Sequence, residues 1–471
     1  MSNGPTPTYS SRRSFIKQAA LVSMGFVALS RCTTTPKPAT VSAYPKLRLD
    51  PNEYLDLPAG FKYRIISHMG QRMDDGFYVP GRADGMGTFA MDDGKVLIVR
   101  NHENSPDSLL HSPFGRKNKM LDRLQKELLY DYGKAKYPGL GGTTNLVYNE
   151  VTGKVEQQFL SLAGTYRNCA GGVTPWGTWL SCEEDITVKG GYAEKDHGFV
   201  FEVPASAKIE IAPPKPIEAM GRFNHEAVAV DPTTGIVYQT EDAGDGLLYR
   251  YIPNVRQRLH EGGRLQALAI IDQPSLDTRN WGRRRVDVGQ SMAVRWIDME
   301  DILDPKGDLR QRGFKQGAAR FARGEGIWFG EGELYFACTN GGPNLHGQVF
   351  RYRTSPQEGT TSEESQPGIL ELFAESTNKS VLHMCDNLTI APWGDLILCE
   401  DNGELNHIKG INPKGEVYEF GINRSSSSEF AGVVFSPSGK TMFVNIQESG
   451  ETLAITGDWS RLAQVSAGVV G

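Results

Sequence analysis

The chain has 471 residues, more than one hydrophobic core usually supports, which predicts several domains or a repeat architecture. Hydrophobic residues make up 39% and charged residues 23%, with 53 glycines, which is typical of a soluble, turn-rich, mostly β protein and excludes a disordered or fibrous one. The net charge of −6, without a basic run, gives no reason to expect a nucleic-acid partner.

Residues 1–45 are expected to form an export signal and a linker. Arg12 and Arg13, followed by an apolar stretch over residues 19–29, resemble a twin-arginine signal. This stretch is too short to span a membrane, so we expect no transmembrane span in the mature protein. We expect a periplasmic or extracellular protein that uses the twin-arginine export machinery. Residues 29–32 resemble a lipoprotein cleavage box, but Arg31 stands where a small residue is usual, and lipidation of Cys32 stays an alternative.

The first strand of the folded part is predicted at residues 61–67, where apolar and polar side chains alternate. A ring of sheets must hide its open edge, and it commonly does so by borrowing a strand from the other end of the chain. We therefore expect this strand to pair with the last sheet.

A hairpin pattern then recurs six times. Each copy is a small or apolar run, a turn rich in Pro, Gly and Asp, and a second apolar run, which is typical of a tight β-hairpin. The copies span residues 86–102, 168–185, 226–243, 325–340, 386–402 and 431–447. Outer hairpins are predicted between them, for example at residues 146–162, 198–211 and 247–271. Together they predict an all-β, six-bladed β-propeller over residues 46–471, with a set of separate β-sandwiches as the alternative.

Two insertions interrupt the repeats. Residues 120–132 have helical spacing, which predicts a helical surface insertion. Residues 274–321 form the longest insertion and lead directly into the Arg323-Gly324-Glu325 sequence. This segment is a candidate lid, a substrate rim or a packing appendage.

Equivalent positions of the six hairpins carry similar chemistry. The first strand of each propeller blade lines the central channel, so equivalent positions converge on one axis. The opening position holds Met86, Cys169, Glu226, Glu325, Asp386 and Ala431, and the position about six residues after the turn glycine holds Arg100, Glu183, Glu241, Cys338, Glu400 and Asn445. Clustered carboxylates and a thiolate would repel one another unless cations lay among them. The pattern predicts a metal site in the channel with the candidate ligands Cys169, Glu183, Glu226, Glu241, Glu325, Asp386 and Glu400.

The donor types restrict the metals. Carboxylates suit calcium or magnesium, whereas a thiolate calls for a transition metal such as iron or zinc. A mixed set indicates more than one kind of metal. Cys182 and Cys399, in equivalent second-strand positions, fit small buried apolar residues instead. The chain has no G-x-S-x-G sequence, so nothing favours a serine nucleophile of that type.

Several motifs in fixed order resemble the PhoX family of bacterial alkaline phosphatases. They are NCAGG-TPWGTW-CEE at residues 168–184, NHEA at residues 224–227, Arg-x-Glu at residues 323–325 and Asp-Asn at residues 386–387, behind a twin-arginine signal. The resemblance covers essentially the whole chain after the signal. It implies a six-bladed propeller with ferric iron and calcium in its channel. By this resemblance Cys169, Glu226 and Glu325 would be iron or shared-metal ligands, Asp386 a calcium ligand and Arg323 the catalytic residue that faces the phosphate.

The implied activity is metal-assisted hydrolysis of a small phosphomonoester by a phosphatase domain at residues 46–471. Arg323 would offer a bidentate fork to the charge that gathers on the phosphoryl oxygens. One alternative is a calcium-dependent propeller lactonase or esterase, which would leave Cys169 unused. Another is a non-catalytic binding propeller, in which the carboxylates hold structural calcium.

Overall fold

The computed structural model describes residues 44–468, which belong to one compact unit. The twin-arginine sequence and Cys32 lie outside the described residues, so export and lipidation stay predictions. Among the described helices, none is long and apolar enough to cross a membrane.

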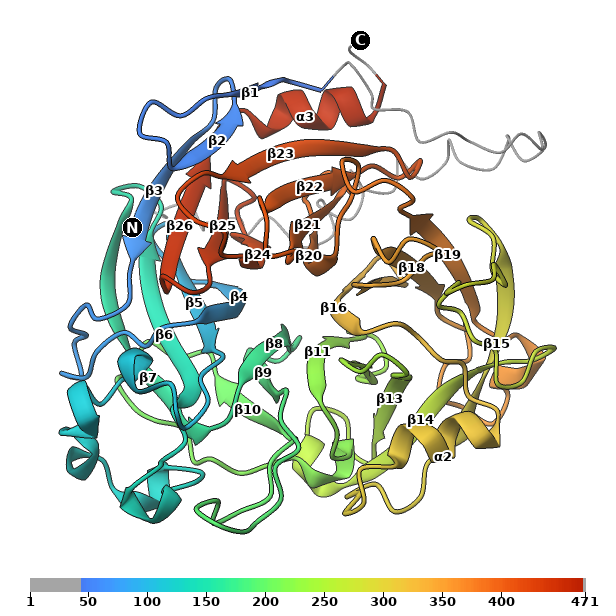
Figure 1. The fold of residues 1–471 in the computed structure, drawn as a ribbon, viewed down its shortest axis with the longest axis horizontal. Coiled ribbons are helices and arrows are strands. Elements are labelled where there is room, and N and C mark those ends of the chain that lie inside the picture. The colour runs from blue at the N-terminus through green and yellow to red at the C-terminus, as the bar shows by residue number, and fades with distance from the viewer. Residues whose placement is uncertain (1–43, 469–471) are drawn as a thin grey trace, which may run out of the picture. The chain divides into compact units, whose positions relative to one another are not determined.

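Antiparallel sheets surround a common centre in a propeller-like arrangement (Figure 1). Each strand next to the centre contacts the following one, and the last contacts the first, which closes the ring. These strands are β4 (Ala83–Ala90), β8 (Asn168–Val173), β11 (His225–Val230), β16 (Gly324–Gly330), β20 (Cys385–Ile390) and β24 (Phe430–Phe435). Each pairs with the strand that follows it, so the six predicted hairpins are confirmed.

The remaining strands extend these hairpins outwards. The first sheet adds β5 (Lys95–His102), β6 (Gly141–Asn149) and β7 (Lys154–Thr165), and the second adds β9 (Thr178–Glu183) and β10 (Val200–Pro204). A nine-stranded sheet contains β11, β12 (Val237–Glu241), β13 (Leu248–Pro253), β14 (Gly263–Ile270), β15 (Ser291–Asp298), β16, β17 (Glu333–Cys338), β18 (Gln348–Arg353) and β19 (Ile369–Glu375). A six-stranded sheet contains β20, β21 (Leu396–Glu400), β22 (His407–Ile411), β23 (Val417–Asn423), β2 (Leu55–Pro58) and β1 (Leu47–Arg48).

The last sheet joins the two ends of the described chain. It contains β24, β25 (Thr441–Ile446), β26 (Glu451–Thr456) and β3 (Lys62–Ser67). Ile65 of β3 stands opposite Leu453 of β26, which confirms the predicted closure. The C-terminal helix α3 (Trp459–Ser466) covers this region, where Trp459 packs on Phe61 and Phe420.

The outer hairpin predicted at residues 198–211 is wrong in its second half. Residues 200–204 form β10, but residues 205–216 contain no strand, and the second sheet keeps only three. Pro213, Pro214 and Pro216 come shortly after the predicted second strand, and proline has no backbone N–H to donate to a hydrogen bond between strands. The backbone N–H of Ala212 instead donates to Ser161 of β7 at 2.7 Å.

The helix predicted at residues 120–132 is also wrong. This segment contains only short 3₁₀ helices, η4 (Leu121–Arg123) and η5 (Lys126–Leu128), separated by extended residues. Its apolar side chains fold inwards, since Leu121 and Leu129 are buried in a cluster with Phe77 and Phe114. The regular apolar spacing therefore reflects packing beneath a loop.

The long insertion at residues 274–321 is partly a packing element. Its strand β15 pairs with β14 on one side and β19 on the other, and joins two four-stranded meanders into the nine-stranded sheet. The helix α2 (Leu309–Gln316) follows. Residues near the start of the insertion border the central loops: Arg279 Nη1 donates to Gly244 O at 2.8 Å, and Trp281 Nε1 donates to Asn340 O at 2.7 Å.

A buried ion-pair network fixes the loop between β18 and β19. Arg250 Nη1 lies 2.5 Å from Glu358 Oε1 and 2.5 Å from Glu363 Oε1, and Tyr238 donates to Glu358 at 2.9 Å. The side chains of Arg250 and Glu358 are 1% and 2% exposed. Removing one partner of such a network leaves uncompensated charge in a low-dielectric interior.

Arg250→Ala is therefore expected to lower the free energy of unfolding by about 3–5 kcal/mol. Urea unfolding followed by fluorescence measures this difference. The control Arg258→Ala removes an ion pair whose arginine is 68% exposed, and a change within about 1 kcal/mol is expected. Equal effects of the two substitutions would contradict a structural role for the network.

Candidate metal centre

Every central strand carries a β-bulge near its start. In each hairpin two residues of the inner strand stand opposite one residue of its partner, as between Ala83 and Met86 of β4. Bulges re-aim side chains and are frequent beside active sites. The first residues of the six bulges, called the bulge positions here, are Asp84, Cys169, Glu226, Glu325, Asp386 and Gly432. Five of these six are metal-ligand types.

A backbone hydrogen bond closes the same end of each hairpin. The residue after the second strand donates its N–H to the carbonyl of the residue before the first strand, as from Glu184 to Arg167 at 2.9 Å. The donors, called the strand-end positions, are Glu103, Glu184, Asp242, Thr339, Asp401 and Gln447. The acceptors, called the pre-strand positions, are Arg82, Arg167, Asn224, Arg323, Met384 and Glu429. The six hairpins therefore present three sets of side chains at one end of the channel.

Nine acidic or thiol side chains from these positions form four groups. Within each group one ligand atom from every member lies within 4.8 Å of the others. The groups are Cys169, Glu184 and Glu226; Glu226, Glu325 and Asp386; Asp386, Asp401 and Glu429; and Asp84, Glu103 and Glu429. Since Glu226, Asp386 and Glu429 each belong to two groups, the four groups form one continuous cluster.

Four of the predicted ligands meet in this cluster: Cys169, Glu226, Glu325 and Asp386. The Cys169 thiol donates to Glu226 Oε1 at 3.2 Å, which joins the thiol to the carboxylates. Glu226 shares a second group with Glu325 and Asp386.

The other predicted ligands, Glu183, Glu241 and Glu400, belong to none of these groups. Each immediately precedes a strand-end position, and side chains alternate along a strand, so its carboxylate turns into its own sheet. Glu241 accepts from the Tyr249 hydroxyl at 3.1 Å, and Glu400 accepts from the His383 N–H at 2.8 Å.

Glu183 holds a buried histidine. His197 Nδ1 lies 2.7 Å from Glu183 Oε1, and His197 Nε2 lies 3.2 Å from Asp131 Oδ2. Tyr166 stacks on the imidazole with ring centroids 3.5 Å apart. Burial lowers the pKa of His197, but Glu183 and Asp131 outweigh it and raise this pKa to about 9. The interaction joins the loop after β5 to the second sheet, behind the strand-end residue Glu184.

Five members of the cluster were not predicted: Asp84, Glu103, Glu184, Asp401 and Glu429. Counting from the turn glycine placed the first and last slots at Met86 and Ala431, two residues beyond an acidic residue in each case. For Glu103, Glu184 and Asp401 the signal in the sequence was an acidic residue directly after the second strand, in the runs NHE, CEE and CED.

Five of the nine side chains are buried and four are half-buried, and their like charges repel one another. Burial first, and the Glu325 carboxylate second, raise the pKa of Glu226. Burial and Glu103 likewise raise the pKa of Asp84 to about 7, and burial with Asp84 raises the pKa of the Cys169 thiol. Glu226 is 1% exposed, and its Oε2 has no hydrogen-bond partner among the described residues. A buried carboxylate oxygen without a donor is costly, so the donor set fits bound cations.

Arg323 stands beside the carboxylates in a fixed orientation. Its Nε and Nη2 donate to Asp242 at 2.8 and 2.9 Å, and Nη2 lies 2.9 Å from Glu325 Oε1. Its backbone has a φ of +48°, a left-handed conformation that is uncommon outside glycine. The Glu325 carboxylate raises the pKa of Arg323, burial lowers it, and Asp242 raises it further. The net effect is a raised pKa, which keeps Arg323 cationic.

Comparison with known proteins assigns the chain to a family. The sequence profile described as Alkaline phosphatase PhoX matches residues 42–147 and 142–450. The chain belongs to the PhoX family. It is a phosphatase, and the prediction from the sequence motifs is confirmed. No curated protein matches the sequence.

Solved structures agree with this family in fold. PhoX from Pseudomonas fluorescens, in complex with vanadate as a transition state analogue, is 18% identical, with a TM-score of 0.61 over 86% of this chain and 96% of that chain. A gluconolactonase from Xanthomonas campestris is 12% identical, with a TM-score of 0.37 over 85% of this chain and 96% of that chain. The first similarity shows the fold, and the second is too weak to carry an argument.

Between the central strands of this PhoX-family phosphatase lies a void of about 10 Å³, among residues that include Met86, Trp328 and Leu388. These residues come after the bulge positions along the same strands, so apolar side chains pack next to the acidic cluster there.

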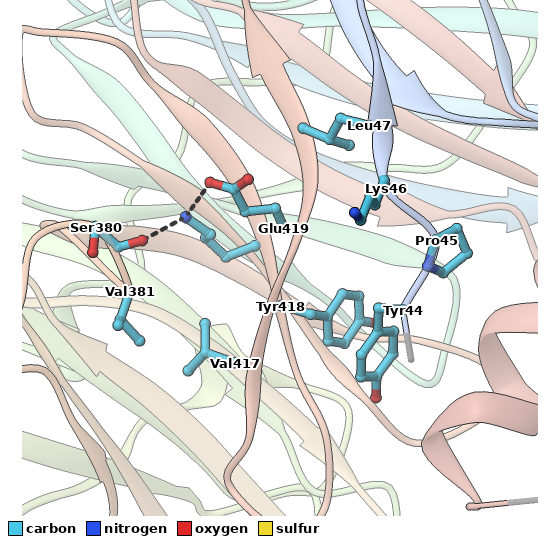
Figure 2. A pocket seen from close by; sticks show the side chains of 10 residues that line it. Tyr44, Pro45, Lys46, Leu47, Ser380, Val381, Val417, Tyr418 and Glu419 are labelled. Atoms are coloured by element: carbon cyan, nitrogen blue, oxygen red, sulfur yellow. Dashed lines mark hydrogen bonds and ion pairs between the residues drawn. The ribbon is translucent and has the colours of Figure 1, made fainter. Parts of the chain in front are cut away.

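A separate cavity of about 380 Å³ lies on the outer strands β22 and β23, beside the first described residues (Figure 2). Tyr44 stacks on Tyr418 there with ring centroids 3.8 Å apart. The buried Lys409 Nζ is paired with Glu419 Oε1 at 3.0 Å and lies 3.4 Å from Ser380 O. This cavity holds none of the clustered acidic or thiol residues.

Cations are expected to stabilise the metal-stripped protein, because they relieve repulsion that is present only in the folded chain. Calcium at about 100 times its dissociation constant should add about 2.7 kcal/mol to the free energy of unfolding. In differential scanning fluorimetry, Glu429→Gln should reduce the calcium-induced rise in Tm, because Glu429 belongs to two groups that offer only oxygen ligands. Glu210→Gln, at a side chain that is 46% exposed, should keep it. A full rise in the Glu429→Gln variant would show that this carboxylate does not bind the cation.

Proposed function

We propose that this PhoX-family phosphatase is an exported alkaline phosphatase that hydrolyses phosphomonoesters with iron and calcium held in the channel of a six-bladed β-propeller. The observation that carries the proposal is the convergence of one thiol with eight carboxylates at equivalent positions of six hairpins. Its substrate is a small phosphoester, and nucleic acid is not a functional partner.

The six-bladed arrangement is supported by the six central strands and their six bulges. The nine-stranded sheet would then count as two blades, β11 to β14 and β16 to β19, and β15 would join them by pairing with β14 and β19. The second sheet would be a blade of three strands, in which a single antiparallel bridge between Pro216 and Phe201 takes the place of a fourth strand.

The donor types support a division of the metals. Cys169, Glu184 and Glu226 combine a thiolate with carboxylates and would hold iron. The two groups that contain Glu429 offer oxygen only, the preference of calcium. Bound cations would supply Lewis acidity toward the phosphoryl oxygens and neutralise their charge.

The chain's own contribution centres on Arg323. The bidentate contact with Asp242 holds the guanidinium in one plane, so that little conformational entropy is lost when it binds a phosphoryl group. A preorganised cation near the equatorial oxygens stabilises the charge of the transition state more than that of the ground state. The relative from Pseudomonas fluorescens was solved with vanadate as a transition state analogue, which supports a phosphoryl-transfer reaction for this chain.

The expected location is the periplasm or the extracellular space. The support is the twin-arginine sequence at Arg12 and Arg13, ahead of a phosphatase domain at residues 46–471. The twin-arginine pathway carries folded proteins, which suits an enzyme that acquires its metals before export.

The two alternatives have less support. A calcium-dependent lactonase or esterase needs only hard cations and leaves Cys169 without a role. A non-catalytic binding module is disfavoured by membership of a phosphatase family.

The Cys169→Ala variant tests the proposal directly. Protein produced with its export signal is expected to contain iron and calcium and to hydrolyse p-nitrophenyl phosphate at alkaline pH, but not a lactone. Cys169→Ala should lose iron and phosphatase activity, as measured by elemental analysis and the same assay. The control Cys182→Ala alters a buried cysteine of β9 that lies outside the cluster, and iron should be retained. Full activity of Cys169→Ala would remove the thiolate from the mechanism.

Arg323→Ala is expected to lower kcat by about 10²–10³-fold, the effect of losing one transition-state donor. Elemental analysis should find the metals still bound, because the variant keeps every clustered ligand. The control Arg264→Ala alters an arginine that is 55% exposed and should not change kcat. A normal rate in Arg323→Ala would show that this side chain does not touch the reacting group.

A further inference from the structure

Arg167 occupies the same place in its hairpin as Arg323 does in another. Arg167 immediately precedes β8, and Arg323 immediately precedes β16. Both have left-handed backbones, with φ of +44° and +48°, and both accept the hairpin-closing hydrogen bond described above. The two side chains therefore leave the backbone under the same local geometry.

The two guanidinium groups are also held in the same manner. Arg167 Nε donates to Glu103 at 2.9 Å, and Nη2 donates to Glu184 at 2.5 Å. Nε and Nη2 of each arginine therefore contact two carboxylates. For Arg167 both carboxylates belong to the cluster, and for Arg323 one of them, Glu325, does. Nη1 of Arg167 makes no hydrogen bond to a described residue. It is not a buried atom without a partner either, so it is exposed to solvent.

Both arginines contact a carboxylate that shares a group with Glu226. Arg167 binds Glu184 of one group, and Arg323 contacts Glu325 of another. The two guanidiniums are therefore linked to one cluster through the two groups that contain Glu226.

We propose that Arg167 is a second phosphoryl-binding residue, which contacts the substrate phosphate and the orthophosphate product together with Arg323. This inference rests on the proposed phosphatase function. A phosphoryl dianion carries charge on several oxygens, and two guanidiniums whose Nε and Nη2 are already engaged can each direct Nη1 to a different oxygen. No other pre-strand cation contacts the cluster carboxylates in the part of the chain that the structure describes.

Arg82 provides a matched control. It fills the equivalent pre-strand position before β4, has a φ of +45°, and its side chain is 33% exposed, compared with 36% for Arg167. Its guanidinium pairs at 2.9 Å with Glu448, which lies outside the cluster.

The test compares Arg167→Ala, Arg167→Lys and Arg82→Ala in metal-replete protein. Arg167→Ala should weaken orthophosphate binding, measured by isothermal titration calorimetry, and raise the inhibition constant of orthophosphate by about 10- to 100-fold, the scale of one hydrogen bond to a charged group. KM for p-nitrophenyl phosphate should rise similarly, Arg167→Lys should recover part of the loss, and Arg82→Ala should bind orthophosphate like the wild type.

Elemental analysis separates binding from a structural role. Unchanged orthophosphate affinity in Arg167→Ala at full metal content would overturn the inference. If that variant loses metal, Arg167→Lys, which keeps a positive charge beside both carboxylates, decides in the same way: weaker binding at full metal content supports the inference and unchanged binding overturns it. A wild-type protein that does not hydrolyse p-nitrophenyl phosphate would instead remove the proposed function.

Discussion

The constraint on which this structure depends is the gathering of nine acidic or thiol side chains around one axis, where five of them are buried and four are half-buried. Like charges at such distances raise one another's pKa and oppose folding. Among the described residues the compensation is small: Arg167 and Arg323 each contact cluster carboxylates, and the neutral amide of Gln447 donates to Asp84 and Glu103. A scaffold that tolerates this repulsion must be rigid, and its sheets must be held by contacts that do not depend on the site.

Close approach of the central strands produces the short distances between ligands. The second residue of each bulge is mostly small, and a side chain there would meet the neighbouring strand. A Cβ at Gly85 would lie 2.6 Å from the Cα of Ala170, and a Cβ at Gly326 would lie 2.7 Å from the backbone nitrogen of Leu388. Glycine thus lets adjacent backbones pack closely, while the preceding bulge residue, Asp84 or Glu325, turns its carboxylate toward the axis. The same short segments of sequence supply both the close packing and the ligands.

The sequence predicted the fold well wherever the structure is local. A hairpin is encoded by its own turn and two apolar runs, so all six were found, and the closing strand β3 followed from the need to cover an edge. The central ligands Cys169, Glu226, Glu325 and Asp386 were nominated because the distance from turn to bulge is nearly constant in those four copies. Asp84 was not predicted, because in its hairpin the distance from turn to bulge is different. In the second strand the choice between adjacent acids, such as Glu183 and Glu184, depends on which face of the strand each occupies, and a one-residue difference in register reverses that assignment.

The order of the ligands along the chain bears on how the centre is assembled. Its members run from Asp84 in the first hairpin to Glu429 at the start of the last, so no partial set of the six central hairpins contains the whole cluster. The ring is completed only when β26 pairs with β3, since that pairing joins the last sheet to the beginning of the fold. Metal binding is therefore coupled to completion of the entire ring.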